Sequence, residues 1–310
     1  MFSKWSDKTN KTYSEIIDNI LNYNSWKIEE IDQFDGAPLS YEVQRTFPND
    51  LTINVNSTKI TFNSLYFSFE EVRSIEFDNP LRSSRVVTYS GNIIIYTDGK
   101  TVQYIIDRAA TTTSKKIIRK INNYTRREQQ IEDAGITFQK DMFLWLFYRV
   151  IGNGSSTIDI NNKEAYINRI TGFKGATTRD EMNAVVSGTG SDLMNLISSL
   201  VFLLEKDSFS QIEISLEFEN DTYVIVLALK NLVNIVFEKC FGKFKGFEED
   251  KLENNAKITL ITLLELVPSI VSSYNTDISN EDWTEEIKKE FYNSVGNEVK
   301  KKLDLKVKNE

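Results

Sequence analysis

The sequence contains no histidine and a single cysteine, Cys240. Without histidine the chain cannot build a Ser-His-Asp or Cys-His catalytic arrangement, nor a histidine-ligated metal site. A single cysteine excludes a disulfide within the chain and a zinc site made of thiolates. Catalysis would have to use Asp, Glu, Lys, Tyr, Ser or Arg, which leaves carboxylate-bound Mg²⁺ as the main enzymatic alternative.

Long apolar runs and an excess of basic residues are also lacking. No run reaches the roughly 18 apolar residues that span a bilayer, because Asn195 interrupts the run at 193–204 and Glu265 the run at 258–267. The opening stretch "MFSKWSDKTNKTYSE" has no apolar core of the signal-peptide kind. We therefore expect a cytoplasmic protein without a membrane span. The net charge of −8 argues against binding nucleic acid through bulk charge.

The chain is long enough for two domains. Its 310 residues are 40% hydrophobic and 26% charged, so each half has enough apolar side chains for a core. The polar segment "TRREQQIEDAG" at 125–135 indicates a helical continuation or a linker. We predict one domain at 1–130 and a second at 131–310.

Short β-like runs fill most of the first domain. The runs "SWKIEEI", "SYEVQRTF", "LTINV", "KITFN", "LYFSF", "RSIEF" and "RVVTYS" indicate a meander of short antiparallel strands. In "GNIIIYTDGKTVQYIID" the pair Asp98-Gly99 predicts a hairpin with a two-residue type I′ turn. Helices are predicted on both sides of these strands, one over 13–23 capped by Thr12 or Ser14 and one that begins near Ser114.

This order of segments resembles a bacterial pleckstrin-homology-like (PH-like) domain over roughly residues 25–124. The resemblance lies in "LTINV", "KITFNSLYFSFEEVRSIEF", "GNIIIYTDGKTVQYII" and "TSKKIIRKINNY", and most of all in "SFEEVRSIEF". It implies a small antiparallel β-sandwich or barrel closed by its C-terminal helix. It also implies a scaffold for protein partners, and in some branches for membranes, with no shared catalytic residues. The turn at 56–59 holds one lysine, so we do not expect lipid headgroup binding.

The second domain is predicted to be α-rich, which makes the whole chain an α+β protein. Helices are expected at 141–151, ending at Gly152, around "KEAYINRI", in "LVNIVFEKCFGKF" and in "KITLITLLELVPSIVSSY". The last of them should kink or end near Pro268. The stretch "QIEISLEFENDTYVIVLAL" predicts an antiparallel hairpin whose second strand lies inside its sheet.

A glycine-rich turn, "SGTGSDL", is the candidate ligand site of the second domain. Gly188 and Gly190 precede Ser191, where an apolar helix begins. Such a turn can hold an anion on free N–H groups and the helix dipole, so a nucleotide or anionic-ligand sensor is one alternative function. It is not a Walker motif, because no lysine follows the second glycine. Helix capping by Ser191 or Asp192 explains the same residues without a ligand.

Asp159, Glu213 and Glu217 are the candidate metal ligands, and Asp159 is the candidate catalytic residue. Strand alternation places Asp159 on the polar face of "STIDIN" and both glutamates on the polar face of "QIEISLEF". If the two strands were neighbours, these carboxylates could share a Mg²⁺ ion in a hydrolase or nuclease. The strand lacks the Glu-x-Lys of a PD-(D/E)xK nuclease, and a solvated strand face explains the same acids.

The C-terminal tail predicts a helix with one apolar stripe. Its apolar residues recur at intervals of four, at Ile287, Phe291, Val295, Val299 and Leu303. This stripe could pair with a partner helix and give a homo-oligomer. The lysines that gather at its end favour the C-terminus of a helix through the dipole and keep the tail soluble.

These features predict a non-catalytic interaction or regulatory protein of a bacterial protein assembly, without a cofactor. Its partner would be another protein, bound through the N-terminal β domain. The Asn/Ile/Lys-rich composition is typical of accessory genes of AT-rich bacteria and their mobile elements, and gives phage defence or its regulation as a hypothesis. The Mg²⁺-dependent hydrolase and the anion sensor are the alternatives.

Overall fold

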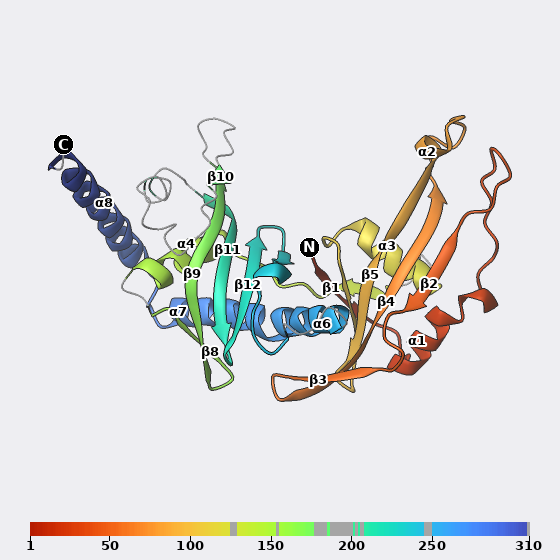
Figure 1. The fold of residues 1–310 in the computed structure, drawn as a ribbon, viewed down its shortest axis with the longest axis horizontal. Coiled ribbons are helices and arrows are strands. Elements are labelled where there is room, and N and C mark those ends of the chain that lie inside the picture. Colours follow the sequence, from red (N-terminus) through yellow and green to blue (C-terminus); the bar gives the residue numbers. More distant parts are fainter. Residues whose placement is uncertain are drawn as a thin grey trace. The chain divides into compact units, whose positions relative to one another are not determined.

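The computed structural model describes residues 1–124, 129–152, 155–176, 185–186, 201, 204, 208–244 and 250–308. The chain divides into two compact units, Met1–Gly135 and Ile136–Glu310, here called the N-terminal and C-terminal units. Each unit contains helices and an antiparallel sheet, so the chain belongs to the α+β class (Figure 1). The division falls after Gly135, whereas the sequence indicated a boundary near residue 130.

The N-terminal unit is built on a seven-stranded antiparallel sheet in the order β2-β4-β5-β6-β1-β7, with β3 paired to the other end of β4 from β2. Its strands are β1 (Ser3–Asp7), β2 (Tyr41–Arg45), β3 (Leu51–Val55), β4 (Thr58–Val72), β5 (Val86–Thr97), β6 (Val102–Ile106) and β7 (Ile131–Asp133). Over the described residues this sheet is antiparallel, as predicted, but it is not closed into a barrel, which corrects the barrel form of the prediction. The reason is β1, which the sequence pattern does not predict and which extends the sheet from β6 to β7.

Two helices, α1 (Tyr13–Leu21) and α3 (Thr112–Ile121), bury their apolar faces in the core of this unit. Ile16, Ile17 and Ile20 of α1 join Ile117, Ile118 and Ile121 of α3 in one cluster with side chains from β4, β5 and β6. The inward residues of these strands include Leu65, Phe67, Phe69, Ile93, Ile95, Tyr104 and Ile106. The core therefore fixes the position of α3 on the sheet.

Local signals in the N-terminal unit are confirmed in part. Of the two predicted caps, Thr12 is the one that caps α1, and it does so in a capping box with Glu15. The cap of α3 is Thr111, whereas Ser114 lies within the helix and donates to the Ala109 carbonyl at 2.6 Å.

The β5–β6 hairpin exists, but its turn is longer than the predicted two residues. Thr97 pairs with Val102, so four residues connect the strands. Asp98 accepts hydrogen bonds from the N–H groups of Lys100 and Thr101, and Gly99 has a φ of +87°. The carboxylate of Asp98 thus organises a turn that the Asp-Gly pair alone does not specify.

Two predicted strands of the N-terminal unit are loops. "SWKIEEI" begins in the 3₁₀ turn η1 (Tyr23–Ser25) and continues as irregular chain, and "RSIEF" lies between β4 and the short helix α2 (Arg82–Arg85). Their apolar residues are exposed, Ile28 to 82% and Ile75 to 90%. These side chains therefore do not alternate into a core, which is the condition a half-buried strand requires.

The C-terminal unit contains a six-stranded antiparallel sheet in the order β10-β9-β11-β12-β13, with β8 paired to β9. Its strands are β8 (Thr157–Ile160), β9 (Lys163–Ala176), β10 (Val185–Val186), β11 (Ser208–Phe218), β12 (Asp221–Ala228) and β13 (Leu232–Ile235). The predicted hairpin is confirmed as β11–β12, and β12 lies inside the sheet. The unit is less helical than predicted, because "KEAYINRI" belongs to β9 and "LVNIVFEKCFGKF" contains β13 and the 3₁₀ turn η3 (Phe237–Lys239).

Helix α4 (Lys140–Ile151) packs against β9 and β11, as its apolar sequence predicts. The ring of Phe147 lies 5.2 Å from that of Phe173 and 4.9 Å from that of Phe209. Gly152 caps the helix through its N–H, which donates to the Tyr148 carbonyl.

A long helical segment follows, made of α6 (Lys251–Ile261), the π turn η5 (Thr262–Leu266) and α7 (Val267–Ser279). The segment does not end near Pro268, which was one predicted outcome: it continues through Pro268 to Ser279, and the π turn lies directly before this proline. Among the described residues, Lys251–Ser279 is the one helix with the length and mean hydropathy, 1.5 over 18 residues, of a membrane span. Because 61% of that window is buried inside the protein, it also has the burial of a core helix.

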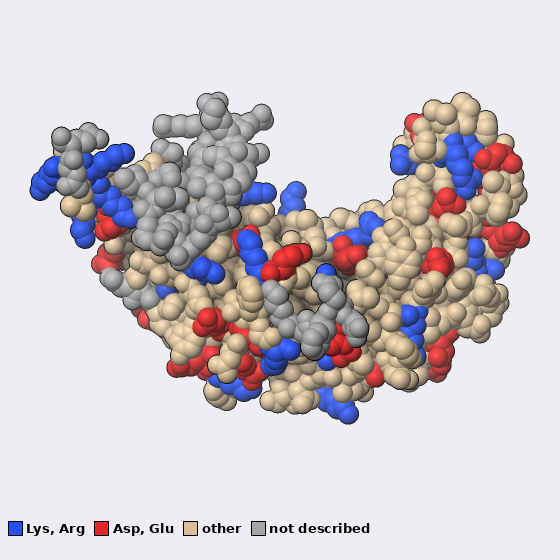
Figure 2. Space-filling model, viewed as in Figure 1, with Lys and Arg blue, Asp and Glu red and all other residues tan. Residues whose placement is uncertain are grey.

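Helix α8 (Glu285–Lys308) confirms the predicted helical tail. Phe291 and Val295 are buried, and the ring of Phe291 lies edge-on to Tyr148 at 5.8 Å. Farther along the stripe, Leu303 is about half exposed. Basic side chains gather at the C-terminal end of the helix (Figure 2).

Candidate functional site

Among the described residues of the second half, those that the sequence singled out are not brought together as a site. Gly188, Gly190 and Ser191 lie outside the described residues. Asp159 is exposed in β8, and its carboxylate accepts a hydrogen bond from the N–H of Asn162 in the β8–β9 turn at 3.2 Å. Asp159 therefore stabilises a tight turn, which is a common use of aspartate.

Glu213 and Glu217 lie on β11, which is separated from β8 by β9. Glu213 accepts hydrogen bonds from Thr171 Oγ1 at 2.7 Å and Lys239 Nζ at 2.8 Å. Glu217 is exposed. Both glutamates thus lie one strand too far from Asp159 for direct strand pairing.

The strand register separates Asp159 from Glu213 further. Asp159 is opposite Glu164 and Glu213 is opposite Gly172, so the two positions are eight residues apart along β9. Eight residues of strand span about 26 Å at roughly 3.3 Å per residue. The described residues contain no group of three or more Asp, Glu, Cys or His placed to hold a metal ion. The arrangement needed for the shared Mg²⁺ ion is therefore not present in the described part of the sheet.

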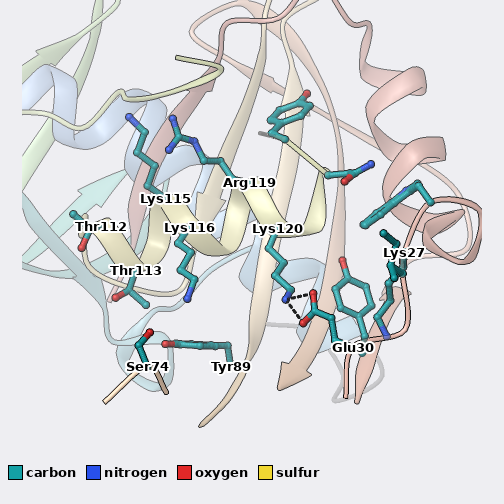
Figure 3. Close-up of a pocket in the computed structure, with 15 residues that line it drawn as sticks. Lys27, Glu30, Ser74, Tyr89, Thr112, Thr113, Lys115, Lys116, Arg119 and Lys120 are labelled. Atoms are coloured by element: carbon teal, nitrogen blue, oxygen red, sulfur yellow. Dashed lines mark hydrogen bonds and ion pairs between the residues drawn. The ribbon is translucent and has the colours of Figure 1, made fainter. Parts of the chain in front are cut away.

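A concave surface of the N-terminal unit runs along α3, with a volume of about 800 Å³. We call it the α3 groove, and Figure 3 shows the side chains that line it. Five of these residues are basic and four are aromatic: Lys27, Lys115, Lys116, Arg119 and Lys120, with Trp26, Tyr41, Tyr89 and Tyr124. This combination distinguishes the groove from a surface of mixed charge.

The sequence of α3 explains why so many cations meet there. Ile117, Ile118 and Ile121 face the core, and this leaves the four basic positions of the helix on the outward face. Lys116 and Lys120 extend from one side of the helix, toward Tyr89 and Glu30 (Figure 3). Lys115 and Arg119 extend from the other side, so the cations form two rows.

Aromatic rings form the floor of the groove beneath the lysines. Lys27 Nζ lies 5.0 Å from the centre of the Tyr41 ring, and Lys116 Nζ lies 5.7 Å from that of Tyr89. The Tyr41 ring stacks on Phe69 at 5.8 Å, which connects the floor to the core. Such cation–π contacts hold lysine stems in place while leaving the ammonium groups accessible.

Two glutamates neutralise part of the positive charge. Glu30 accepts hydrogen bonds from Lys120 Nζ at 3.0 and 2.8 Å, and Glu71 forms an ion pair with Lys116. Lys27 and Lys115 have no carboxylate partner among the described residues. Among the described residues, the four lysines of the groove thus face two carboxylates, and they give it an excess of positive charge in a protein whose net charge is −8.

Tyr41 adds a neutral hydrogen-bond donor to the groove. Burial, with smaller effects from Tyr23 and Glu30, raises the pKa of Tyr41 well above its ordinary value of 10.0, so its hydroxyl stays protonated. This hydroxyl oxygen is buried and has no hydrogen-bond partner in the described structure.

The sequence contains a signal for this groove that is separate from the apolar pattern of α3. The basic residues of "SKKIIRK" recur as neighbouring pairs four positions apart, which places them in two rows along the outward face of a helix. The contribution of Lys27 and the aromatic residues could not be read in this way, because they come from segments far away in the chain. Compared with known proteins, the sequence matches no protein-family model and no curated protein.

Proposed function

We propose that the protein is a non-catalytic interaction protein of a bacterial protein assembly, and that its α3 groove binds an acidic segment of a partner protein. The observation that carries this proposal is the excess of lysine and arginine in a concave surface of an otherwise acidic protein. Complementary charge of this kind gives specificity and speeds association.

A carboxylate ligand fits the groove better than a nucleic acid does. Lys116 and Lys120 already bind side-chain carboxylates, those of Glu71 and Glu30. Nucleic acid binding gains its affinity from many phosphate contacts, which are opposed here by these two glutamates and by the net charge of −8. The groove therefore suits a ligand with a few negative charges.

The proposal includes a PH-like origin for the N-terminal unit. It is supported by the succession of antiparallel strands followed by α3, which packs on the sheet. Strands β1 and β7 and the exposed loop at "RSIEF" depart from the pattern and weaken the resemblance. Phage defence, self-association through α8, the Mg²⁺-dependent hydrolase and the anion sensor stay predictions from the sequence.

Fluorescence anisotropy with a labelled oligoglutamate peptide tests the proposal on the full chain. We expect binding that weakens with added salt, because the contacts are between charges. The double variant Lys27→Glu/Lys115→Glu should bind about tenfold more weakly or not at all. These two lysines have no carboxylate partner among the described residues, so their reversal breaks no described ion pair.

The matched control is Lys59→Glu/Lys100→Glu, which changes the net charge equally at two exposed positions of the same unit, one at the start of β4 and one in the β5–β6 turn. It should bind the peptide within about twofold of wild type, because long-range charge effects are screened by salt. Equal losses in both double variants, or tighter binding of a single-stranded oligonucleotide than of oligoglutamate, would overturn the proposal.

A further inference from the structure

Four large apolar side chains on two loops beside the α3 groove are exposed to solvent. Ile28 and Ile31 belong to the loop before β2, and Ile75 and Phe77 to the loop after β4, with exposed fractions of 82, 54, 90 and 59%. Single exposed apolar residues are ordinary, but a group of them marks an interaction surface. We call these four residues the apolar wall.

The apolar wall is continuous with the basic groove. A second cavity of about 570 Å³ is lined by Ile31 and Phe77 together with Lys116 and Lys120, and both lysines also line the α3 groove. Ile28 and Ser74, the neighbour of Ile75, line the α3 groove itself. A bound chain segment can therefore contact lysines and apolar side chains at the same time.

The loops that carry the wall are held by a buried arginine, so their exposure does not come from loose chain. Arg85 is 1% exposed, and its Nε donates to Asp32 at 2.7 Å. Its Nη1 donates to the carbonyls of Asn79 and Pro80 at 3.1 and 3.0 Å, and its guanidinium lies 4.5 Å from the ring of Phe34. One side chain thus joins the loop before β2 to the loop after β4.

Both loops also differ from the strands that their sequences predict. Their apolar spacing predicts strands with inward-facing side chains, yet the structure turns these side chains to solvent. Residues that violate a local rule in this way are expected where function requires them.

From this continuity and from the charge of the groove, we infer that the partner segment is amphipathic, with carboxylates for the α3 lysines and apolar side chains for the apolar wall. This inference rests on the proposed function and specifies its ligand. The apolar contacts supply affinity that exposed ion pairs alone do not, since a buried apolar side chain contributes more than an exposed charge pair.

Two labelled peptides of equal charge test the inference on the full chain, one repeating Glu-Glu-Leu and the other Glu-Glu-Ser. Wild type should bind the leucine peptide about tenfold more tightly or better. Ile28→Ser/Phe77→Ser should reduce this preference to about twofold while leaving the affinity for the serine peptide unchanged. Leu252→Ser/Leu305→Ser, which removes exposed leucines of the C-terminal unit, is the control and should keep the full preference.

The outcomes separate this inference from the proposed function. Equal affinity of wild type for both peptides, with binding still lost in Lys27→Glu/Lys115→Glu, would overturn the apolar wall and retain the acidic-segment function. Failure of wild type to bind either peptide would overturn both. Tighter binding to phosphatidylserine-containing vesicles than to the leucine peptide, lost in Ile28→Ser/Phe77→Ser, would also overturn the inference, because the wall would then be a membrane contact.

Discussion

Asp32 shows how a single buried charge organises the edge of the α3 groove. Its side chain is fully buried, and its carboxylate accepts hydrogen bonds from Arg85 Nε and from the N–H of Phe34 at 3.1 Å. Burial alone would raise the pKa of Asp32. The hydrogen bonds from Phe34 and Arg85 and the charges of Arg85 and Arg82 outweigh that effect and lower the pKa below its ordinary value of 3.8. The folded protein therefore favours the ionised form more than the unfolded chain does.

We predict that the stability contributed by Asp32 depends on pH. Because the folded-state pKa is the lower one, this contribution is complete above the unfolded value of about 4 and is lost as the pH falls through the folded value. The difference in Tm between wild type and Asp32→Asn should be largest near neutral pH and shrink below about pH 4. Thermal unfolding followed by circular dichroism over this range measures it. A difference that stays constant down to the lowest pH would contradict the ionised pair.

At the scale of single elements, one glycine in the β5–β6 turn and one in α8 allow two tests of backbone conformation. Substitution by alanine should have effects of opposite sign at the two positions. Gly99 has a φ of +87°, and Gly296 lies within α8 without a positive φ. A Cβ added at either position would meet no atom within 4 Å. Differences between the two substitutions would therefore report backbone conformation alone.

We predict that Gly99→Ala destabilises the protein by about 1 kcal/mol, because alanine rarely adopts a positive φ. Gly296→Ala should instead stabilise α8 by about 0.5–1 kcal/mol, since alanine has the higher helix propensity. Urea unfolding of the two variants beside wild type measures both changes. Effects of the same sign would contradict either the left-handed turn or the helix.

The β9 strand shows why part of the C-terminal sheet could not be predicted. Its buried residues Ala165, Ile167, Ile170 and Phe173 are separated by two, three and three positions. Two register shifts opposite β11 cause this spacing, because each of them adds a residue to β9 between Ile167 and Phe173. A spacing of three resembles a helix face, and the sequence pattern therefore predicted helix at "KEAYINRI".

Strand β1 was invisible to the sequence pattern for another reason. Its inward residues are Ser3, Trp5 and Asp7, of which one is apolar. The buried carboxylate of Asp7 is stabilised by the hydroxyl groups of Tyr104 and Tyr124, which donate hydrogen bonds to it at 2.6 and 2.8 Å. Helices α1, α3, α4 and α8 were predictable because apolar residues recur along their inward faces. The basic face of α3 was predictable from the regular spacing of its lysines and arginine. The groove as a whole was not, because it joins residues from several distant segments.

At the scale of the whole molecule, the end of the N-terminal unit is set by β7 and not by the polar linker. Ile131 is fully buried in the N-terminal core, and β7 pairs with β1 through residues 131–133. The Ala134 N–H donates to the Lys4 carbonyl at 2.9 Å. A boundary at residue 130 would therefore remove an edge strand from this unit.

We predict that a fragment of residues 1–135 is more stable than a fragment of residues 1–130. Loss of the buried Ile131 side chain should cost about 2–4 kcal/mol, together with the β1–β7 hydrogen bonds. Urea unfolding of the two fragments gives the difference directly. Equal midpoints would show that β7 contributes nothing to this unit and would return the boundary to the linker.

The hydrogen bonds by which Arg85 joins the two loops have a consequence for the rates at which a partner segment binds and dissociates. Because the loops before β2 and after β4 are already joined to each other, little chain has to become ordered when a segment arrives. The lysines would then set the association rate constant, which would fall as the ionic strength rises. The apolar wall would govern how long the segment remains, and its residence time would be almost independent of salt.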